Sequence, residues 1–324
     1  MTDINNDNSS PSLNNQYTPN MNVTIAGVKF RNPVIAASGT FGSGKEYTDY
    51  FDVSVLGGMC TKGLTMIPRS GNSGTRVWET PSGLLNSIGL ENIGIHSFLE
   101  KELPAMRQLG PVIIANLCGA ETNEYVKGAV ILNDSPIDMI ELNISCPNVK
   151  VGGMAFGLDP GTSAALVSAV RRVCRHKPLI VKLTPNAPSL SSIARSCINA
   201  GADVLSLVNS FKAMAIDTVN RKPVFDYITA GLSGPAIKPI ALHLVWELID
   251  TLKESKSKIP VIGIGGIACT EDALEFLMAG ASAIQVGSAT FSNPHTMIDI
   301  ISGLQKYMAS NHILNIDDIS IREK

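Results

Sequence analysis

The sequence lacks the features that mark secreted, membrane and nucleic-acid-binding proteins. Residues 1–20 carry neither a basic start nor an apolar stretch and so predict no secretory signal. No segment approaches the roughly 20 apolar residues of a membrane helix, because Lys238 and His243 interrupt the longest apolar run, 235–249. Lys and Arg number 26 against 28 Asp and Glu, and this net charge of −2 argues against a nucleic-acid surface. We therefore expect a cytoplasmic protein with neither a membrane nor a nucleic acid as its partner.

Cysteine is sparse, and its spacing excludes the common metal sites. The six cysteines are dispersed without a C-x-x-C pair, which favours free thiols in a reducing compartment. Zinc and iron–sulfur spacings are absent, so no metal is predicted. A dinucleotide fingerprint is absent too, because GIGGIA (263–268) has Ala268 in place of the last glycine of G-x-G-x-x-G.

The sequence does contain enough apolar material for a large core. Hydrophobic residues make up 44% of the chain, so global disorder is not expected. Residues 1–20, rich in Asn, Ser and Pro, are predicted to form a disordered tail. The segment VTIAGVKFR (23–31) predicts a β-hairpin that turns at Ala26-Gly27. We expect one domain over 21–311 and a C-terminal extension over 312–324.

Short apolar runs alternate with helical patterns along the rest of the chain. Eight runs have the composition of buried strands: 33–38, 53–63, 112–119, 139–146, 179–185, 204–210, 260–266 and 283–289. The segments that predict helices are 97–109, 121–132, 162–176, 190–200, 235–256 and 271–279. Thr162 or Ser163 would cap the third of these helices, and Thr270 and Gly280 would bound the last. Eight such units favour a (β/α)8 TIM barrel, with an open doubly wound sheet as the alternative.

Two long connections follow the second and sixth predicted strands. They span 64–96 and 211–234. Both come after a strand, so they are predicted on the C-terminal face of the barrel, where barrel active sites lie. Long ordered loops at such places are typical of functional sites.

Polar side chains recur where the predicted strands end, at one rim of the barrel. They are Ser38, Lys62, Asn116, Asn143, Lys182 and Asn209. Lys182 is the most informative, because burying its ammonium group without a partner would cost several kcal/mol. Either this side chain reaches the barrel mouth, or it pairs with Glu141. Six polar residues on one rim favour a ligand site over separate structural roles.

Glycine-rich turns close the last two predicted strands. GIGGI (263–267) ends the seventh strand and QVGSA (285–289) the eighth, and loops at these two positions form a phosphate site in many barrels. The residues that would offer backbone N–H groups there are Gly265, Gly266, Gly287 and Ser288. GLSGP (231–235) adds a third such turn. Glycines that serve only tight turns are the alternative, but their presence at both strand ends favours phosphate binding.

Cys146 is the candidate reactive residue. It precedes Pro147, which disfavours helical backbone, and it follows the fourth strand toward the predicted barrel mouth. A cysteine nucleophile usually needs a histidine base, and none of the five histidines is clearly placed for that role. Proton transfer is therefore favoured over acyl transfer, with a structural thiol as the alternative.

Amide side chains gather near the same rim. Asn86 lies in the first long connection, and the others are Asn143, Asn148 and Asn209. Amides pair well with planar N–H and C=O edges, so a cyclic amide or pyrimidine-like ligand is predicted. Any one of these asparagines taken alone could equally be a turn former.

Together these motifs closely resemble those of the dihydroorotate dehydrogenases. The resemblance extends over about 22–308 and rests on NSIGLEN (86–92), ELNISCPN (141–148), LIVKLTP (179–185), GLSGPAIKPIAL (231–242) and IPVIGIGGI (259–267). Cys146 stands where the membrane-bound class would have serine, and in this respect the chain resembles the class 1 enzymes. Two further segments resemble class 1B, the NAD-linked catalytic subunit: NVKVGGMAFGLDP (148–160) and RKPVFDYITAGLSGPAIKPIAL (221–242).

The resemblance implies FMN-dependent oxidation of (S)-dihydroorotate to orotate, a step of de novo UMP biosynthesis. Cys146 would remove the C5 proton, and hydride would pass from C6 to the flavin. The residues that it implies for the substrate are Lys62, Asn86, Ser87, Ile88, Gly89, Leu90, Asn143, Asn148, Asn209 and Ser210. Those that it implies for FMN are Ser38, Lys62, Gly63, Asn116, Asn143, Lys182, Val208, Gly234, Gly265, Gly266, Gly287 and Ser288.

The resemblance also implies a partner subunit. Class 1B enzymes pair the catalytic subunit with one that carries FAD and a 2Fe–2S cluster and passes electrons to NAD, so we expect a heterotetramer built on a homodimer. One alternative is a fumarate-linked class 1A enzyme. Another is a different FMN barrel reductase, such as one acting on tRNA uridines, which the balanced charge disfavours. A barrel that binds a phosphorylated ligand without turnover is the non-enzymatic alternative.

Overall fold

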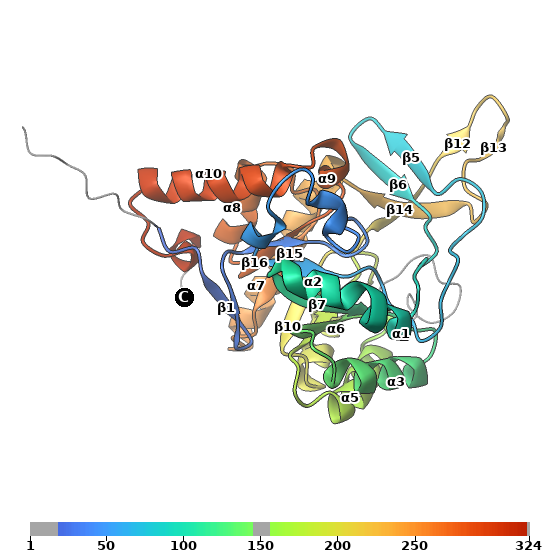
Figure 1. The fold of residues 1–324 in the computed structure, drawn as a ribbon, viewed down its shortest axis with the longest axis horizontal. Coiled ribbons are helices and arrows are strands. Elements are labelled where there is room, and N and C mark those ends of the chain that lie inside the picture. The colour runs from blue at the N-terminus through green and yellow to red at the C-terminus, as the bar shows by residue number, and fades with distance from the viewer. Residues whose placement is uncertain (1–18, 145–155, 323–324) are drawn as a thin grey trace, which may run out of the picture.

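The centre of the molecule is a closed barrel of eight parallel strands, seen in a computed structural model that describes residues 19–144 and 156–322 (Figure 1). In chain order the strands are β3 (Val34–Ala36), β4 (Gly58–Cys60), β7 (Val112–Leu117), β8 (Met139–Asn143), β9 (Leu179–Lys182), β10 (Val204–Leu207), β15 (Val261–Ile264) and β16 (Ala283–Val286). β16 pairs with β3, and this pairing closes the sheet. The prediction of a (β/α)8 barrel is confirmed, and the open sheet is excluded.

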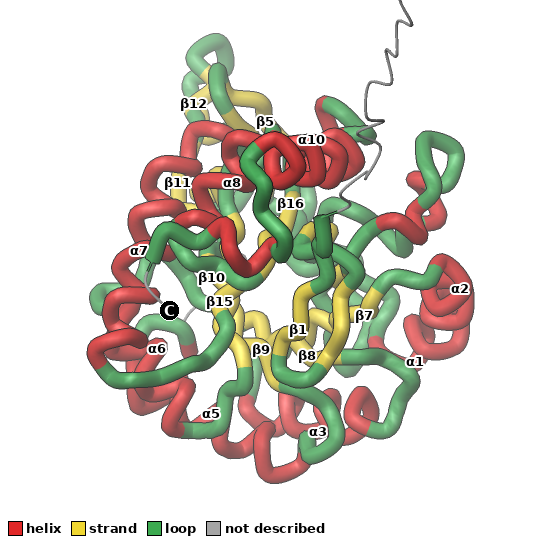
Figure 2. Tube along the Cα trace, turned by 90° about the vertical axis from the view of Figure 1, so that its left-hand side faces the viewer, coloured by secondary structure: helices red, strands yellow, loops and turns green. Residues whose placement is uncertain are grey.

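Each barrel strand is short and almost entirely buried, as its composition predicts. β8, β9, β10, β15 and β16 have no exposed residue. Valine, isoleucine and leucine fill both faces of these strands, because helices cover the outside while side chains fill the inside. Figure 2 shows the helices ringed around the strands.

Between β3 and β4 the chain forms two 3-10 turns, Lys45–Tyr47 and Val53–Val55, whereas each of the other barrel strands is followed by α-helices. They are α1 (Ile95–Ser97), α2 (Leu103–Leu109), α3 (Thr122–Asn133), α5 (Pro160–Val173), α6 (Leu190–Asn199), α7 (Lys238–Glu254), α8 (Thr270–Met278), α9 (Ala289–Ser292) and α10 (Thr296–Ser310). A π-helical turn, Phe98–Glu102, joins α1 to α2, and a 3-10 turn, Pro235–Ile237, precedes α7. α9 and α10 follow the eighth strand and were not among the predicted helices.

Several predicted boundaries were wrong, each for a local reason. The strand predicted from residue 53 begins only at Gly58, because the Asp52 carboxylate accepts from the Ser54 amide and starts a 3-10 turn. The helix expected from 162 is capped instead by Asp159, whose carboxylate accepts from the Thr162 amide at 2.7 Å. The cap of α8 is Cys269, and Thr270 is its first helical residue.

The predicted N-terminal hairpin is present as β1 (Val23–Ile25) and β2 (Val28–Phe30). Ala26 and Gly27 between them have φ of 46° and 84°, the pair of positive values that a two-residue type I′ turn requires. Ile25 and Phe30 are buried in the same apolar cluster as the barrel strands. The hairpin therefore packs as part of the core.

The two long connections meet in a second, antiparallel sheet, here called the roof sheet. It consists of β11 (Phe211–Met214), β14 (Thr229–Ser233), β6 (Gly83–Asn86) and β5 (Val77–Thr80), in that order. A small ribbon, β12 (Ile216–Asp217) and β13 (Lys222–Pro223), extends from it. Figure 1 shows the roof sheet standing to one side of the barrel. Its position, after strands β4 and β10, is the one predicted for functional loops.

The C-terminal segment returns to the start of the fold. The Asn20 and Asn315 backbones form a β-bridge, and Ile316 is buried behind it. The Arg322 guanidinium stacks over the Trp246 ring at 3.9 Å. Within residues 19–144 and 156–322, no helix combines the length and apolarity needed to cross a membrane.

Candidate active site

A cavity of about 250 Å³ lies at the carboxyl ends of the barrel strands, under the roof sheet. Barrel residues such as Ser38, Lys62 and Asn143 line one part of it, and Leu84 and Ser233 of the roof sheet line another. This is the face where barrel enzymes hold their ligands. The long connections therefore build one wall of the cavity from segments far apart in the chain.

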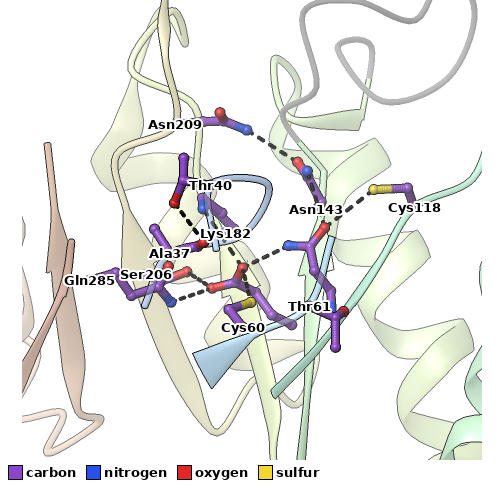
Figure 3. Close-up of polar contacts among 12 residues, drawn as sticks. Ala37, Thr40, Cys60, Thr61, Cys118, Asn143, Lys182, Ser206, Asn209 and Gln285 are labelled. Atoms are coloured by element: carbon purple, nitrogen blue, oxygen red, sulfur yellow. Dashed lines mark hydrogen bonds and ion pairs between the residues drawn. The ribbon is translucent and has the colours of Figure 1, made fainter. Parts of the chain in front are cut away.

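Below the cavity, a carboxylate lies inside the barrel with donors from five strands around it (Figure 3). Glu141 on β8 is fully buried. Its Oε1 accepts from Asn116 Nδ2 at 2.7 Å and Cys60 Sγ at 3.4 Å. Its Oε2 accepts from Ser206 Oγ and Gln285 Nε2, each at 2.9 Å. The Lys182 ammonium lies 3.7 Å from Oε1.

The surroundings of Glu141 keep it ionised. Burial by itself would raise the pKa of this carboxyl, but the Lys182 ammonium and the hydrogen bonds from neutral neighbours hold that pKa below its ordinary value. Burial, reinforced by the Glu141 charge, raises the pKa of the Cys60 thiol well above its usual range. Cys60 therefore stays protonated and donates to the carboxylate.

Lys182 satisfies both of the alternatives that its sequence position left open. It pairs with Glu141, and it also lines the cavity, although only 6% of the residue is exposed. Its neighbour in register on β8 is Asn143, which also lines the cavity. One cation with an amide beside it therefore forms part of the cavity floor.

The predicted amides connect to one another around this floor. Asn209 Nδ2 donates to Asn143 Oδ1 at 3.2 Å, and Asn143 Nδ2 donates to Asn116 Oδ1 at 3.4 Å. On the roof sheet, Asn86 Nδ2 donates to the Gly231 carbonyl at 3.1 Å. Asn86, Asn143 and Asn209 all line the cavity. Their groups are thus oriented before any ligand arrives, as precise recognition requires.

A second cation, Lys62, lines the cavity from the end of β4. Its ammonium lies 3.4 Å from Glu91 Oε2, which also pairs with Arg76 at 3.2 Å. Lys62 and Arg76 together hold the pKa of Glu91 below its usual value. All three side chains are more than a third exposed, so water screens these pairs and each contributes little to stability.

The glycine turns form the far end of the cavity, where Gly234, Gly265, Gly266, Gly287 and Ser288 line it. Gly266 has φ of 71°, and a Cβ there would come within 2.8 Å of the Lys238 amide nitrogen and the Gly234 carbonyl. A Cβ on Gly287 would meet only Ala37 and Thr40, at 3.6 Å and more. Close backbone packing therefore requires glycine at position 266, whereas Gly287 leaves cavity space open.

Charged side chains on α7 and α8 hold the turn after β15 in place. Asp272 on α8 accepts from the Ala268 amide at 2.9 Å and the Cys269 amide at 3.2 Å. The Lys238 ammonium on α7 lies 2.8 Å from Asp272 and 2.9 Å from Glu275. These hydrogen bonds to Asp272 and Glu275 raise the pKa of Lys238. The Gly265–Gly266 turn is therefore fixed between two helices.

The structure brings most of the predicted site residues together. Those that line the cavity are Ser38, Lys62, Gly63, Asn86, Ile88, Leu90, Asn143, Lys182, Val208, Asn209, Ser210, Gly234, Gly265, Gly266, Gly287 and Ser288. Cys146 and Asn148 lie outside the described residues.

Three predicted residues lie behind the cavity wall. Asn116 is fully buried between Glu141 and Asn143. Ser87 accepts from Asn72 Nδ2 at 2.9 Å. Gly89 has φ of 75°, and a Cβ there would strike Asn72. Asn116 thus contacts a residue that lines the cavity, whereas Ser87 and Gly89 pack against Asn72, which does not line it.

Sequence reasoning did not single out several residues that line the cavity. Thr40, Leu84, Ser233 and Phe291 are among them. Ser233 lies in the quoted GLSGP turn, which was its only signal. Gln285 and Ser206, which hold Glu141, were also missed, although each is a polar residue within an apolar strand.

The fold and this cavity define a class: a (β/α)8 barrel with a ligand site that combines two lysines, several amides and glycine turns. The family model for dihydroorotate dehydrogenase matches residues 20–308. A relative from Petrotoga mobilis, dihydroorotate dehydrogenase B (NAD(+)), catalytic subunit, is 53% identical over 297 residues, covering 92% of this chain and 97% of its own length.

Two further relatives carry the same description. They come from Geotalea daltonii and Thermoanaerobacter pseudethanolicus and are each 47% identical, covering 93% of this chain and 97% of their own length. The chain belongs to the dihydroorotate dehydrogenase family.

Proposed function

We propose that this chain oxidises (S)-dihydroorotate to orotate with FMN, in the cytoplasm, as a step of de novo pyrimidine synthesis. The observation that carries the proposal is the cavity floor, where the Lys182 ammonium and the Asn143 and Asn209 amides face one space bounded by glycine turns. The relatives of the same family, named as dihydroorotate dehydrogenases, support the substrate.

The cavity fits FMN. Gly287 leaves room that a side chain would fill, and Gly265 and Ser288 line the same cavity, an arrangement suited to a phosphate group. Gly234, Gly265, Gly266, Gly287 and Ser288 would hold the phosphate end. The residues for the ring system are Ser38, Lys62, Gly63, Asn143, Lys182 and Val208, with Asn116 acting through Asn143. When bound, FMN supplies the hydride acceptor at its N5.

The chain's own residues bind the substrate and move one proton. Asn86, Asn143, Asn209 and Ser210 would pair with the N–H and C=O edges of the pyrimidine ring, and Lys62 would contact both the flavin and the substrate. Ile88 and Leu90, which line the cavity, would complete that pocket with Ser87 and Gly89 behind them, and we propose the same role for Asn148. Cys146 takes the C5 proton while the C6 hydride leaves, so the C5=C6 double bond of orotate forms with electrons and protons balanced.

We further propose that the electrons leave through a partner subunit. The relatives are named as catalytic subunits of an NAD(+) enzyme, and this wording supports a second subunit. That partner would carry FAD and a 2Fe–2S cluster and bind NAD, in a heterotetramer with two catalytic chains. A fumarate-linked enzyme is the competing assignment, and orotate formation with fumarate as the only acceptor would favour it.

Anaerobic bleaching tests the proposed reaction directly. The purified chain, loaded with FMN, should show a flavin absorption spectrum that bleaches when dihydroorotate is added without oxygen. A spectrum that stays unbleached would reject dihydroorotate as the substrate. A chain that binds no FMN would reject the cofactor assignment as well.

Filling the proposed phosphate site should weaken FMN binding. Gly287→Ala places a methyl group where no atom lies within 3.6 Å, so the fold should be unchanged while the Kd for FMN rises about tenfold, equivalent to about 1.4 kcal/mol. Flavin fluorescence titration of the apoprotein measures this. Gly161→Ala at the start of α5 is the matched control, expected to bind FMN normally. An unchanged Kd for Gly287→Ala would place the phosphate elsewhere.

A further inference from the structure

A buried anion below the cavity has no role in the proposed chemistry so far. Glu141 touches no ligand position, because it does not line the cavity and is fully buried. Its carboxylate nevertheless receives hydrogen bonds or an ion pair from β4, β7, β9, β10 and β16. Burying an ion costs free energy unless the ion is fully paired, so a residue that only filled space at this position would more simply be apolar.

Two connections link Glu141 to the cavity, and the shorter one passes through a single residue. The Lys182 ammonium lies 3.7 Å from its Oε1 and also lines the cavity floor. Asn116 gives a second connection, because its amide donates to Glu141 while its carbonyl oxygen accepts from Asn143. The carboxylate thus fixes both the cation and the amide that face the ligand.

We propose that Glu141 is a positioning residue that sets the reduction potential of the flavin by fixing Lys182 and offsetting part of its charge. This inference rests on the proposed function. A reduced flavin carries more negative charge than an oxidised one, so the Lys182 cation favours reduction. The Glu141 anion opposes reduction, and inside a protein this opposition is weakly screened.

The offset suits an enzyme that passes its electrons on. A lysine without a counter-charge would stabilise the reduced flavin and so retain the electron pair. With Glu141 ionised beneath it, the same lysine keeps its place and its hydrogen-bonding ability while its field at the flavin is smaller. The pair therefore allows tight binding of FMN without stabilising the reduced flavin so strongly that it retains its electrons.

The structure indicates that the neutral variant Glu141→Gln can fold. Gln285 Oε1 is the only buried side-chain oxygen or nitrogen without a hydrogen-bond partner in the described part of the chain. Its amide points Nε2 at the carboxylate, as an ionised Glu141 demands. In the variant, rotating the Gln285 amide would present Oε1 to the new amide group and so keep a hydrogen bond between these two side chains.

The test is the midpoint potential of bound FMN, measured by equilibration with a redox dye under anaerobic conditions. Glu141→Gln should shift the equilibrium toward reduced flavin by about tenfold, which is about +30 mV for a two-electron couple. Lys182→Met should shift it in the opposite direction by at least as much. Ser206→Ala is the matched control, because it removes one hydrogen bond from Glu141 but no charge, and its potential should stay within 10 mV of wild type, roughly a twofold change.

Opposite signs at Glu141 and Lys182 are the signature that a merely structural role would not give. An unchanged or lowered potential in Glu141→Gln overturns the inference, as does an equal shift in Ser206→Ala. If Glu141→Gln does not fold, an unchanged potential in Lys182→Met overturns it. Wild-type protein that bleaches normally with dihydroorotate keeps the proposed function in each of these cases, whereas wild-type protein that binds no FMN overturns both.

Discussion

Replacing Cys146 with serine is expected to slow reduction of the bound flavin by dihydroorotate at least a hundredfold at neutral pH. A positioned general base contributes about 10²–10⁴-fold to a rate, and a serine hydroxyl is a far weaker base than a thiolate. FMN content and substrate affinity should stay near normal, because the thiol is proposed to act on the proton alone. Stopped-flow measurement of anaerobic bleaching gives the rate.

The control for this experiment is Cys269→Ser. Cys269 is an exposed free thiol at the start of α8, and serine is itself a good N-cap. This variant should bleach at the wild-type rate. Near-normal bleaching in Cys146→Ser would contradict the assignment of Cys146 as the base, and equal slowing in both variants would point to a general effect of losing a thiol.

Removing the cation from the buried pair is expected to have the largest effect on stability. Lys182→Met leaves the fully buried Glu141 charge without its cation, and breaking such a pair typically lowers the free energy of unfolding by about 3–5 kcal/mol. Urea denaturation of the apoprotein at pH 7 measures the loss. The variant should also bind FMN more weakly than the wild type, because Lys182 lines the cavity.

The loss should depend on pH in a defined direction. In the wild type the pKa of Glu141 is lowered, so its contribution to stability is present above the unfolded pKa, about 4.3, and is lost as the pH falls through the lower folded pKa. Without Lys182, burial would dominate and raise that pKa. The deficit of the variant should therefore be full at neutral pH and should shrink as the pH falls toward the range where the carboxyl is protonated.

A double variant separates the charge from the shape of the site. Lys182→Met combined with Glu141→Gln removes both charges and should recover much of the lost stability, because no unpaired ion remains. If the double variant is as unstable as the sum of the two single variants, the pair is not coupled, and the loss comes from packing instead.

The barrel was predictable because its signals are local. Each strand is a short apolar run followed by a turn, and the polar residue at the end of a run marks the rim. Lys182 also shows the limit of this reasoning, since its pattern could not separate pairing with Glu141 from exposure at the mouth. The structure has both, because the ammonium group lies between the carboxylate and the cavity.

Other features could not be predicted because they depend on register and on distant segments. The place of Asn116 depends on register, because it is the partner of Glu141, while Asn143 on the next strand is the partner of Lys182. Asn116 therefore lies deeper in the barrel than Asn143, at the level of Glu141. The roof sheet escaped prediction because its strands are short and because its two hairpins, β5–β6 and β11–β14, join only through the pairing of β6 with β14 across the two long connections.

The roof sheet has a consequence for the order in which the protein is built. Asn86 on β6 and Gly231 on β14 are 145 residues apart, so their pairing closes a loop that contains much of the barrel, at a high cost in chain entropy. During synthesis the β5–β6 hairpin leaves the ribosome long before β14 exists. We expect that one edge of this hairpin stays unpaired until the last third of the chain has been synthesised. The cofactor chamber is thus completed only once nearly the whole protein has been made, and cofactor loading becomes a late event of maturation.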